Sequence, residues 1–78
     1  MINVEKIREH MEVVGSDGRH VGKVDHIRGS EIELAKFDLG AGLKHHVIPL
    51  SWVEDVRDEK VRLNLTQDDA KALWMSKH

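Results

Sequence analysis

The chain has 78 residues, no cysteine, and 12 lysine and arginine residues against 14 aspartate and glutamate residues. Disulfides and thiolate metal sites are therefore excluded. The near-neutral charge, spread evenly over both halves of the chain, argues against electrostatic binding to nucleic acid. The first residues lack the apolar run of a signal peptide, and no stretch approaches the roughly 18 apolar residues of a membrane span. We therefore expect a cytoplasmic protein without membrane insertion.

The length favours a single small domain. Its N-terminal part is typical of a short helix, because Asn3 can cap a turn that runs to about Arg8. Such a segment is too short to be stable alone and must pack on the rest of the domain. We divide the domain, 1–78, into an N-terminal helical segment, a β-rich body and a C-terminal helix, over residues 1–10, 11–65 and 66–78.

The body contains β-branched and alternating segments separated by turn residues. Asp17-Gly18 is a strong hairpin signal, because glycine adopts positive φ at no steric cost. Gly29 marks the next tight turn. The pattern predicts six strands, over residues 11–14, 20–28, 31–38, 45–50, 52–56 and 61–65.

The longest break between strands is Asp38–Lys44, which we interpret as a flexible loop. Its Gly40-Ala41-Gly42 lacks the spacing and the lysine-serine ending of a phosphate-binding loop. Further on, Pro49 holds Ile48 in extended geometry and favours an edge or the end of a strand.

The second strand departs from simple alternation. Val21, Val24 and Ile27 recur every three residues, but the flanking glycines argue against a helix. Bulges, or strands covered on both faces, account for this pattern.

The C-terminal helix is predicted from about Thr66 to Ser76. Thr66 is a good N-cap, and Asp69 at the third helical position approximates a capping box. Leu73 and Trp74 fall on the same face as Ala70, so we expect this face to dock on the body.

The order and spacing of several short motifs resemble the PRC-barrel family, especially its short stand-alone bacterial members of unknown function. The resemblance covers roughly Met11 to Trp74. It rests on Asp17-Gly18, Val21-Gly22-Lys23-Val24, Ile48-Pro49, Trp52-Val53, and Val61-Arg62-Leu63 before a terminal helix.

The family includes the cytoplasmic barrel of the photosynthetic reaction centre H subunit and the C-terminal domain of a ribosome maturation factor. The resemblance implies a mainly β fold, a small, strongly bent six-stranded barrel used for protein contacts. It implies no catalytic residue and no cofactor. The family's glycine and Ile-Pro positions correspond here to Gly18, Gly22, Ile48 and Pro49, for which it implies a structural role.

The six histidines do not predict a metal site. His45 and His46 are adjacent in a strand and should point to opposite faces. His20 and His26 share a face but would lie roughly 20 Å apart along a straight strand. His46 is a candidate for pH-sensitive self-association, because imidazole titrates near neutrality.

Acidic residues likewise suggest no acid–base pair. Nothing in the spacing of Asp25, Asp38, Glu54 and Asp55 places two carboxylates in one pocket. No serine lies in a nucleophile elbow. We therefore predict no catalytic, cofactor-binding or metal-binding residues, and a protein that is not an enzyme.

Trp52 and Trp74 are the large aromatic residues most important to place. We interpret both as anchors of the core or of the terminal helix. The alternative is that one contributes to a partner interface, where tryptophan is enriched among energetic hot spots.

The resulting hypothesis is a non-enzymatic protein-interaction or self-assembly module. One alternative is an RNA- or ribosome-associated factor that uses basic residues gathered by folding: Arg8, Arg19, Lys23, Arg28 and Lys44. The other is a small ligand binder or enzyme. We also expect a homodimer, because the chain is short and the apolar residues Val24, Ala35 and Phe37 have no obvious place in a single-faced core.

Overall fold

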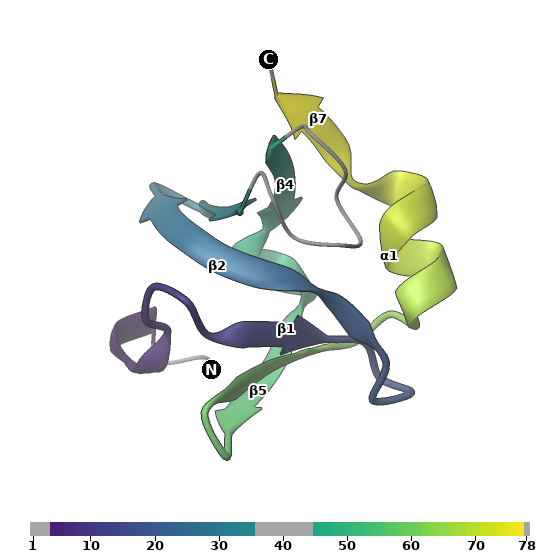
Figure 1. Ribbon diagram of the computed structural model, residues 1–78, viewed down its shortest axis with the longest axis horizontal. Coiled ribbons are helices and arrows are strands. Elements are labelled where there is room, and N and C mark those ends of the chain that lie inside the picture. The colour runs from purple at the N-terminus through teal and green to yellow at the C-terminus, as the bar shows by residue number, and fades with distance from the viewer. Residues whose placement is uncertain (1–3, 36–44, 78) are drawn as a thin grey trace.

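The protein is mainly β, with one α-helix near its C-terminus (Figure 1). The structure, a computed structural model, describes residues 4–35 and 45–77. Its elements in chain order are η1 (Val4–Lys6), β1 (Glu12–Val14), β2 (His20–Arg28), β3 (Glu31–Leu34), β4 (His45–Pro49), η2 (Leu50–Trp52), β5 (Val53–Arg57), β6 (Lys60–Leu63), α1 (Gln67–Leu73) and β7 (Met75–Lys77).

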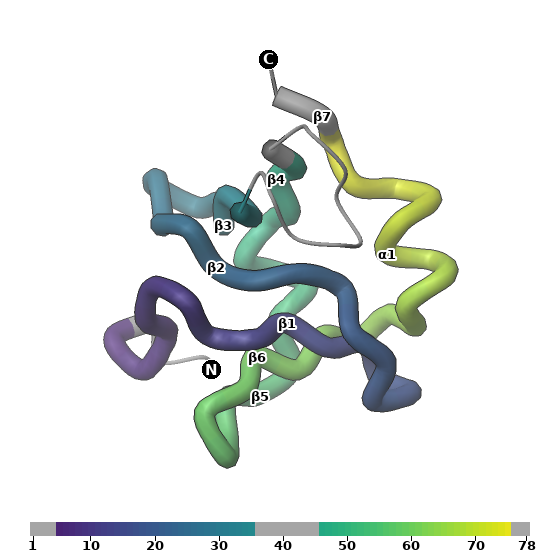
Figure 2. Tube along the Cα trace, in the orientation of Figure 1, coloured from purple at the N-terminus to yellow at the C-terminus, as the bar shows by residue number. Residues whose placement is uncertain are grey.

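Seven strands pair in the order β5-β6-β1-β2-β3-β4-β7. Neighbours are antiparallel except β1 and β6, which run parallel and lie side by side in Figure 2. β5 and β7 stand at the two ends of this order, so the sheet does not close into a ring within residues 4–35 and 45–77. The six predicted strands are present, and β7 is an addition that the sequence pattern did not indicate.

β2 is the strand on which the two halves of the sheet meet. Its first residues pair with β1, and the residues from Val24 onward pair with β3. The register skips one residue of β2 in each pairing, Val21 opposite β1 and Asp25 opposite β3. An extra residue of this kind bends a strand and increases its twist. The three-residue spacing of valine and isoleucine in β2 thus corresponds to bulges.

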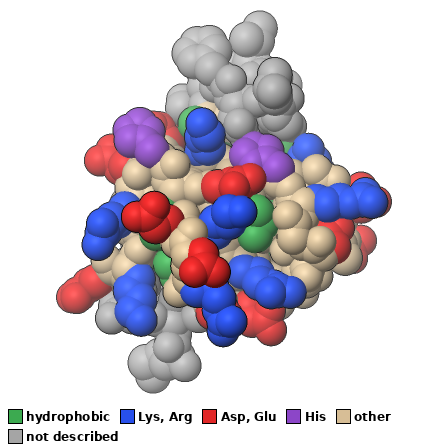
Figure 3. All heavy atoms as spheres, turned by 60° about the horizontal axis from the view of Figure 1, so that its bottom comes forward, with side chains coloured by type: hydrophobic (Ala, Val, Ile, Leu, Met, Phe, Trp, Pro, Cys, Tyr) green, Lys and Arg blue, Asp and Glu red, His purple; other side chains and the backbone are tan. Residues whose placement is uncertain are grey.

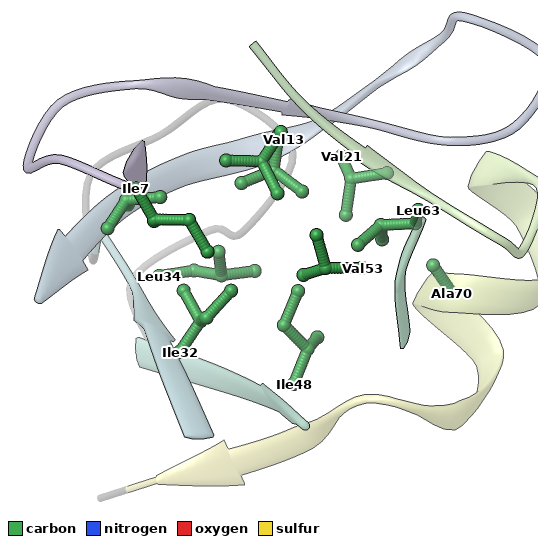
Figure 4. Close-up of a cluster of buried hydrophobic side chains, with 11 residues drawn as sticks. Ile7, Val13, Val21, Ile32, Leu34, Ile48, Val53, Leu63 and Ala70 are labelled. Carbon is green, nitrogen blue, oxygen red and sulfur yellow. The ribbon is translucent and has the colours of Figure 1, made fainter. Parts of the chain in front are cut away.

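The core fills the space between the two halves, where side chains of both point toward one another (Figure 4). Val24 is only 1% exposed and belongs to this core, so a second subunit is not needed to bury it. The bulges turn it inward beside Val21. The largest fully buried side chains are Ile32, Leu34, Ile48, Leu63, Val13, Val21, Val24 and Val61.

The N-terminal segment differs from the predicted helix. Among residues 4–10, only Val4–Lys6 forms a helical turn, of the 3₁₀ type. After this turn the backbone forms hydrogen bonds with β2: His10 N–H donates to the Val24 carbonyl, and Val24 N–H donates to the Met11 carbonyl. His10 adopts a φ of 71° to make this junction. Pairing with the sheet therefore ends the helical turn early.

The C-terminal helix begins as predicted. Thr66 is its N-cap, and the Thr66 hydroxyl accepts a hydrogen bond from Asp69 N–H. The helix ends at Leu73, several residues before the predicted end at Ser76, because Trp74 is extended and the next residues pair with β4. No helix among residues 4–35 and 45–77 is both long and apolar enough to cross a membrane.

Two predicted features lie partly or wholly outside the described residues. β3 ends at Leu34, and the remainder of the strand predicted to Asp38 falls largely in residues 36–44. Phe37 and the loop with Gly40-Ala41-Gly42 also lie there.

The buried glycine at the end of β1 fixes how closely α1 approaches the sheet. A Cβ added at Gly15 would lie 2.5 Å from the backbone nitrogen of Gln67 and 2.9 Å from the carbonyl carbon of Thr66. By contrast, a Cβ at Gly18 would meet no atom, although its φ of 81° disfavours other residues.

We expect Gly15→Ala to lower the free energy of unfolding by about 3 kcal/mol, because the start of α1 must shift to accommodate the methyl group. Gly18→Ala, the matched control, should cost only about 1 kcal/mol from its left-handed backbone. Urea unfolding followed by circular dichroism measures both. Equal losses for the two variants would contradict the close packing of Gly15 on α1.

Candidate functional site

A cluster of charged side chains lies on the hairpin formed by β2 and β3. In a regular strand, Asp25 and His26 would point to opposite faces of the sheet. The bulge at Asp25 removes this restriction, and His26 then pairs across the strands with Glu33. The bulge therefore brings one imidazole and two carboxylates together.

The contacts within this cluster are short. His26 Nδ1 lies 3.3 Å from Asp25 Oδ2, and His26 Nε2 lies 3.4 Å from Glu33 Oε2. Arg28 Nε donates a hydrogen bond of 2.6 Å to His26 Nε2 and lies 3.5 Å from Glu33 Oε2. One ligand atom from each of Asp25, His26 and Glu33 can be chosen so that all three lie within 4.8 Å of one another.

Burial within the cluster is uneven. Glu33 is only 6% exposed, whereas Asp25 and His26 are half-buried and Arg28 is exposed. A buried carboxylate is costly unless it is paired. Arg28 and His26 supply positive charge or hydrogen-bond capacity beside Glu33, so the cluster forms a compensated polar site on the β2–β3 hairpin.

A second pair of a histidine and a carboxylate lies at the other end of β2. His20 Nδ1 is 2.8 Å from Glu12 Oε2, and Lys60 Nζ is 3.7 Å from the other oxygen of the same carboxylate. This pair has a single carboxylate and a lysine, and it offers a natural comparison for the cluster around His26.

The C-terminal segment forms a different kind of surface. The ring of Trp74 stacks on the ring of buried His46, with centroids 3.8 Å apart and an interplanar angle of 14°. This stack holds the segment after α1 against β4. On either side of Trp74, Leu73 is 62% exposed and Met75 is 53% exposed.

A groove of about 470 Å³ separates the N-terminal segment from the hairpin between β5 and β6. Three non-glycine residues with positive φ border it, His10, Asp58 and Glu59. Three acidic residues balance three lysine and arginine residues in its lining, so it has no dominant charge. Its lining residues are Lys6, Arg8, Glu9, His10, Met11, Val56, Arg57, Asp58 and Glu59.

The residues singled out from the sequence occupy scattered structural positions. Gly18 forms the turn before β2, and Gly22 is buried opposite Val13. Ile48 is fully buried opposite Ile32, and Pro49 ends β4 opposite Glu31. Trp52 ends η2 and packs, partly buried, on the core, whereas Trp74 packs on the core and on His46.

The sequence interpretation missed the partnership of Asp25 with Glu33. Asp25 was considered only beside other acids, one of which, Asp55, instead contacts Arg57 at 3.2 Å. The broken alternation of β2 carried the signal, because a bulge re-aims the side chains next to it. Of the other candidates, Asp38 and Lys44 lie outside the described residues, as does the side chain of His45.

Comparison with known proteins yields one family. A family model described as an uncharacterized protein conserved in bacteria (DUF2171) matches residues 7–71. Because the match covers most of the chain, the protein belongs to this family. No curated protein and no solved structure matches the chain.

The partial burial of Trp52 leads to a test of its role. Trp52→Ala should lower the free energy of unfolding by about 3 kcal/mol, since the ring packs on the core. Trp52→Phe, which keeps most of the apolar contact, should lose less than half as much. Chemical denaturation measures both, and an unchanged stability accompanied by lost self-association would instead assign Trp52 to an interface.

Proposed function

We propose that this DUF2171 protein is a non-enzymatic protein-interaction module that assembles as a homodimer through the edge of β7. One observation carries the proposal. Among the residues whose side chains the structure describes, the exposed large hydrophobic ones are Leu73 and Met75. Leu73 is the last residue of α1, and Met75 is the first residue of β7, the last strand of the sheet. An edge strand flanked by apolar side chains is a template for pairing with another chain.

The two edges of the sheet differ in a way that supports this choice. β5, at the opposite end, has Glu54 exposed and an ion pair between Asp55 and Arg57. Charged side chains on an edge strand disfavour pairing with another chain. The edge of β7, with Leu73 and Met75 exposed beside it, is therefore the one that we propose for association.

A second copy of the chain is the occupant that the geometry favours. Two β7 strands placed antiparallel would be related by a two-fold axis, so each copy offers the same surface to the other. Leu73 and Met75 of both copies would then lie close to that axis and cover one another. No second type of protein is needed to bury them.

Association of this kind does not complete the core. The chain exposes 4996 Å², close to the roughly 4,800 Å² expected of a folded monomer of this mass. The short length of the chain therefore supports a dimer less strongly than the exposed side chains beside β7 do. We propose a reversible dimer of folded subunits.

The alternative of an RNA-associated factor receives less support. Arg19 lies 3.9 Å from Asp17, and Arg28 contacts Glu33, so these two bases are compensated by acids. On the face drawn in Figure 3, basic and acidic side chains alternate. A surface for phosphate needs basic residues gathered without such compensation.

Kinship with the PRC-barrel family is part of the proposal. The strand pattern, the central bent strand and the Ile48-Pro49 segment support it. An experimental structure of the intact protein, compared with members of that family, decides whether the sheet is a variant of their barrel.

We expect Leu73→Asp to lower the dimer association constant at least tenfold, because two buried charges would face each other across the two-fold axis. Light scattering over a dilution series from millimolar to micromolar protein measures the constant. Ala72→Asp adds the same charge at an exposed neighbouring position of α1, without removing an apolar contact, and should change the constant less than threefold.

Two results would contradict the proposal. One is a monomeric mass at every concentration. The other is a dimer that both variants leave equally stable, which would place the interface elsewhere.

A further inference from the structure

The hydrogen bond from Arg28 indicates the tautomer of His26. A guanidinium is always protonated and has no acceptor, so the nitrogen that receives its hydrogen bond carries no proton. That nitrogen is His26 Nε2. The ring proton of the neutral imidazole is then on Nδ1, the nitrogen that lies 3.3 Å from Asp25 Oδ2.

This arrangement has the form of a metal-binding histidine. Metal-ligating histidines usually direct their second ring nitrogen to a carboxylate, which fixes the tautomer and the ring orientation. Here Asp25 takes that place, and His26 Nε2 lies 3.4 Å from Glu33 Oε2. Two ligands of a tetrahedral zinc ion, each about 2.0–2.1 Å from the metal, are separated by a similar distance of roughly 3.4 Å.

We propose that Asp25, His26 and Glu33 form a binding site for a divalent transition-metal ion such as Zn²⁺. His26 Nε2 and the Glu33 carboxylate are its direct ligands, and Asp25 orients His26 through Nδ1. Water completes the coordination, because His26 is half-buried and solvent reaches it. An imidazole beside carboxylates suits zinc, whereas calcium and magnesium prefer sites built only of oxygen.

Arg28 competes with the metal ion for this site. Its Nε lies 2.6 Å from His26 Nε2 and 3.5 Å from Glu33 Oε2, so the guanidinium occupies the position that the metal ion would take. Two cations cannot share that position. Since the Arg28 side chain is exposed, it can rotate into solvent when the metal enters. Without metal, Arg28 compensates the charge of buried Glu33.

This competition distinguishes a built metal site from an ordinary ion-pair network. Removing Arg28 from a network only weakens the protein. Removing it from the proposed site destabilises the metal-free protein as well, but it strengthens metal binding, because the competing cation is gone.

The test uses isothermal titration of the untagged full chain with zinc chloride. Wild-type protein should bind one zinc ion, and Arg28→Gln should bind it about fivefold more tightly or better. Glu33→Gln and His26→Asn should weaken binding at least tenfold, and Asp25→Asn about tenfold. His20→Asn, which alters the comparable pair with Glu12, should leave the affinity unchanged.

A measurement on the wild-type chain keeps the test independent of how the variants fold. In ¹⁵N-labelled protein, zinc should shift the amide resonances of residues 24–34 and the imidazole resonances of His26. Absence of saturable binding, or shifts centred on residues 45–46 instead, would overturn the proposal. So would Arg28→Gln binding zinc more weakly than wild type.

Discussion

The whole structure depends on the bend in β2. A single nine-residue strand, β2, belongs to both halves of the sheet. At Val24, where β2 changes its partner from β1 to β3, the backbone also forms hydrogen bonds with the N-terminal segment. A flat strand would leave the two halves coplanar and their apolar faces exposed. Two extra residues, Val21 and Asp25, supply the added twist. The sheet can then fold over itself and bury a core on its concave side without a disulfide.

The same bend organises the outer surface. The side chain of an extra residue in a strand does not follow the regular alternation. Asp25, one of the residues that bend β2, therefore lies on the same side as its neighbour His26 and contacts it. The position of Glu33 follows from the register of β3, in which its two neighbours, Ile32 and Leu34, are buried in the core. The carboxylate is therefore held by a strand that the core fixes on its opposite face.

The pattern of apolar residues predicted nearly all of the body. β2 was predicted with its observed limits, and the turns at Gly18 and Gly29 do have positive φ, because both signals are local. The pattern failed where contacts between residues distant in sequence determine the local structure. The N-terminal turn is shortened by bonds to Val24. Predicting the cluster at His26 requires the register between β2 and β3. The broken alternation of β2 indicated a bulge but did not specify this register.

The C-terminal segment shows the same competition between local and distant forces. Its helical periodicity continues past Leu73, yet the chain leaves the helix there because Trp74 finds a stacking partner in His46 and the following residues find hydrogen-bond partners in β4. Extending the helix would bury neither the indole nor the edge of β4. Because the chain leaves the helix at this point, Leu73 and Met75 remain outside the core. The family match spans residues 7–71, so it includes the cluster at His26 and ends before these two residues. The proposed metal site and the proposed self-association surface therefore lie on separate parts of the chain.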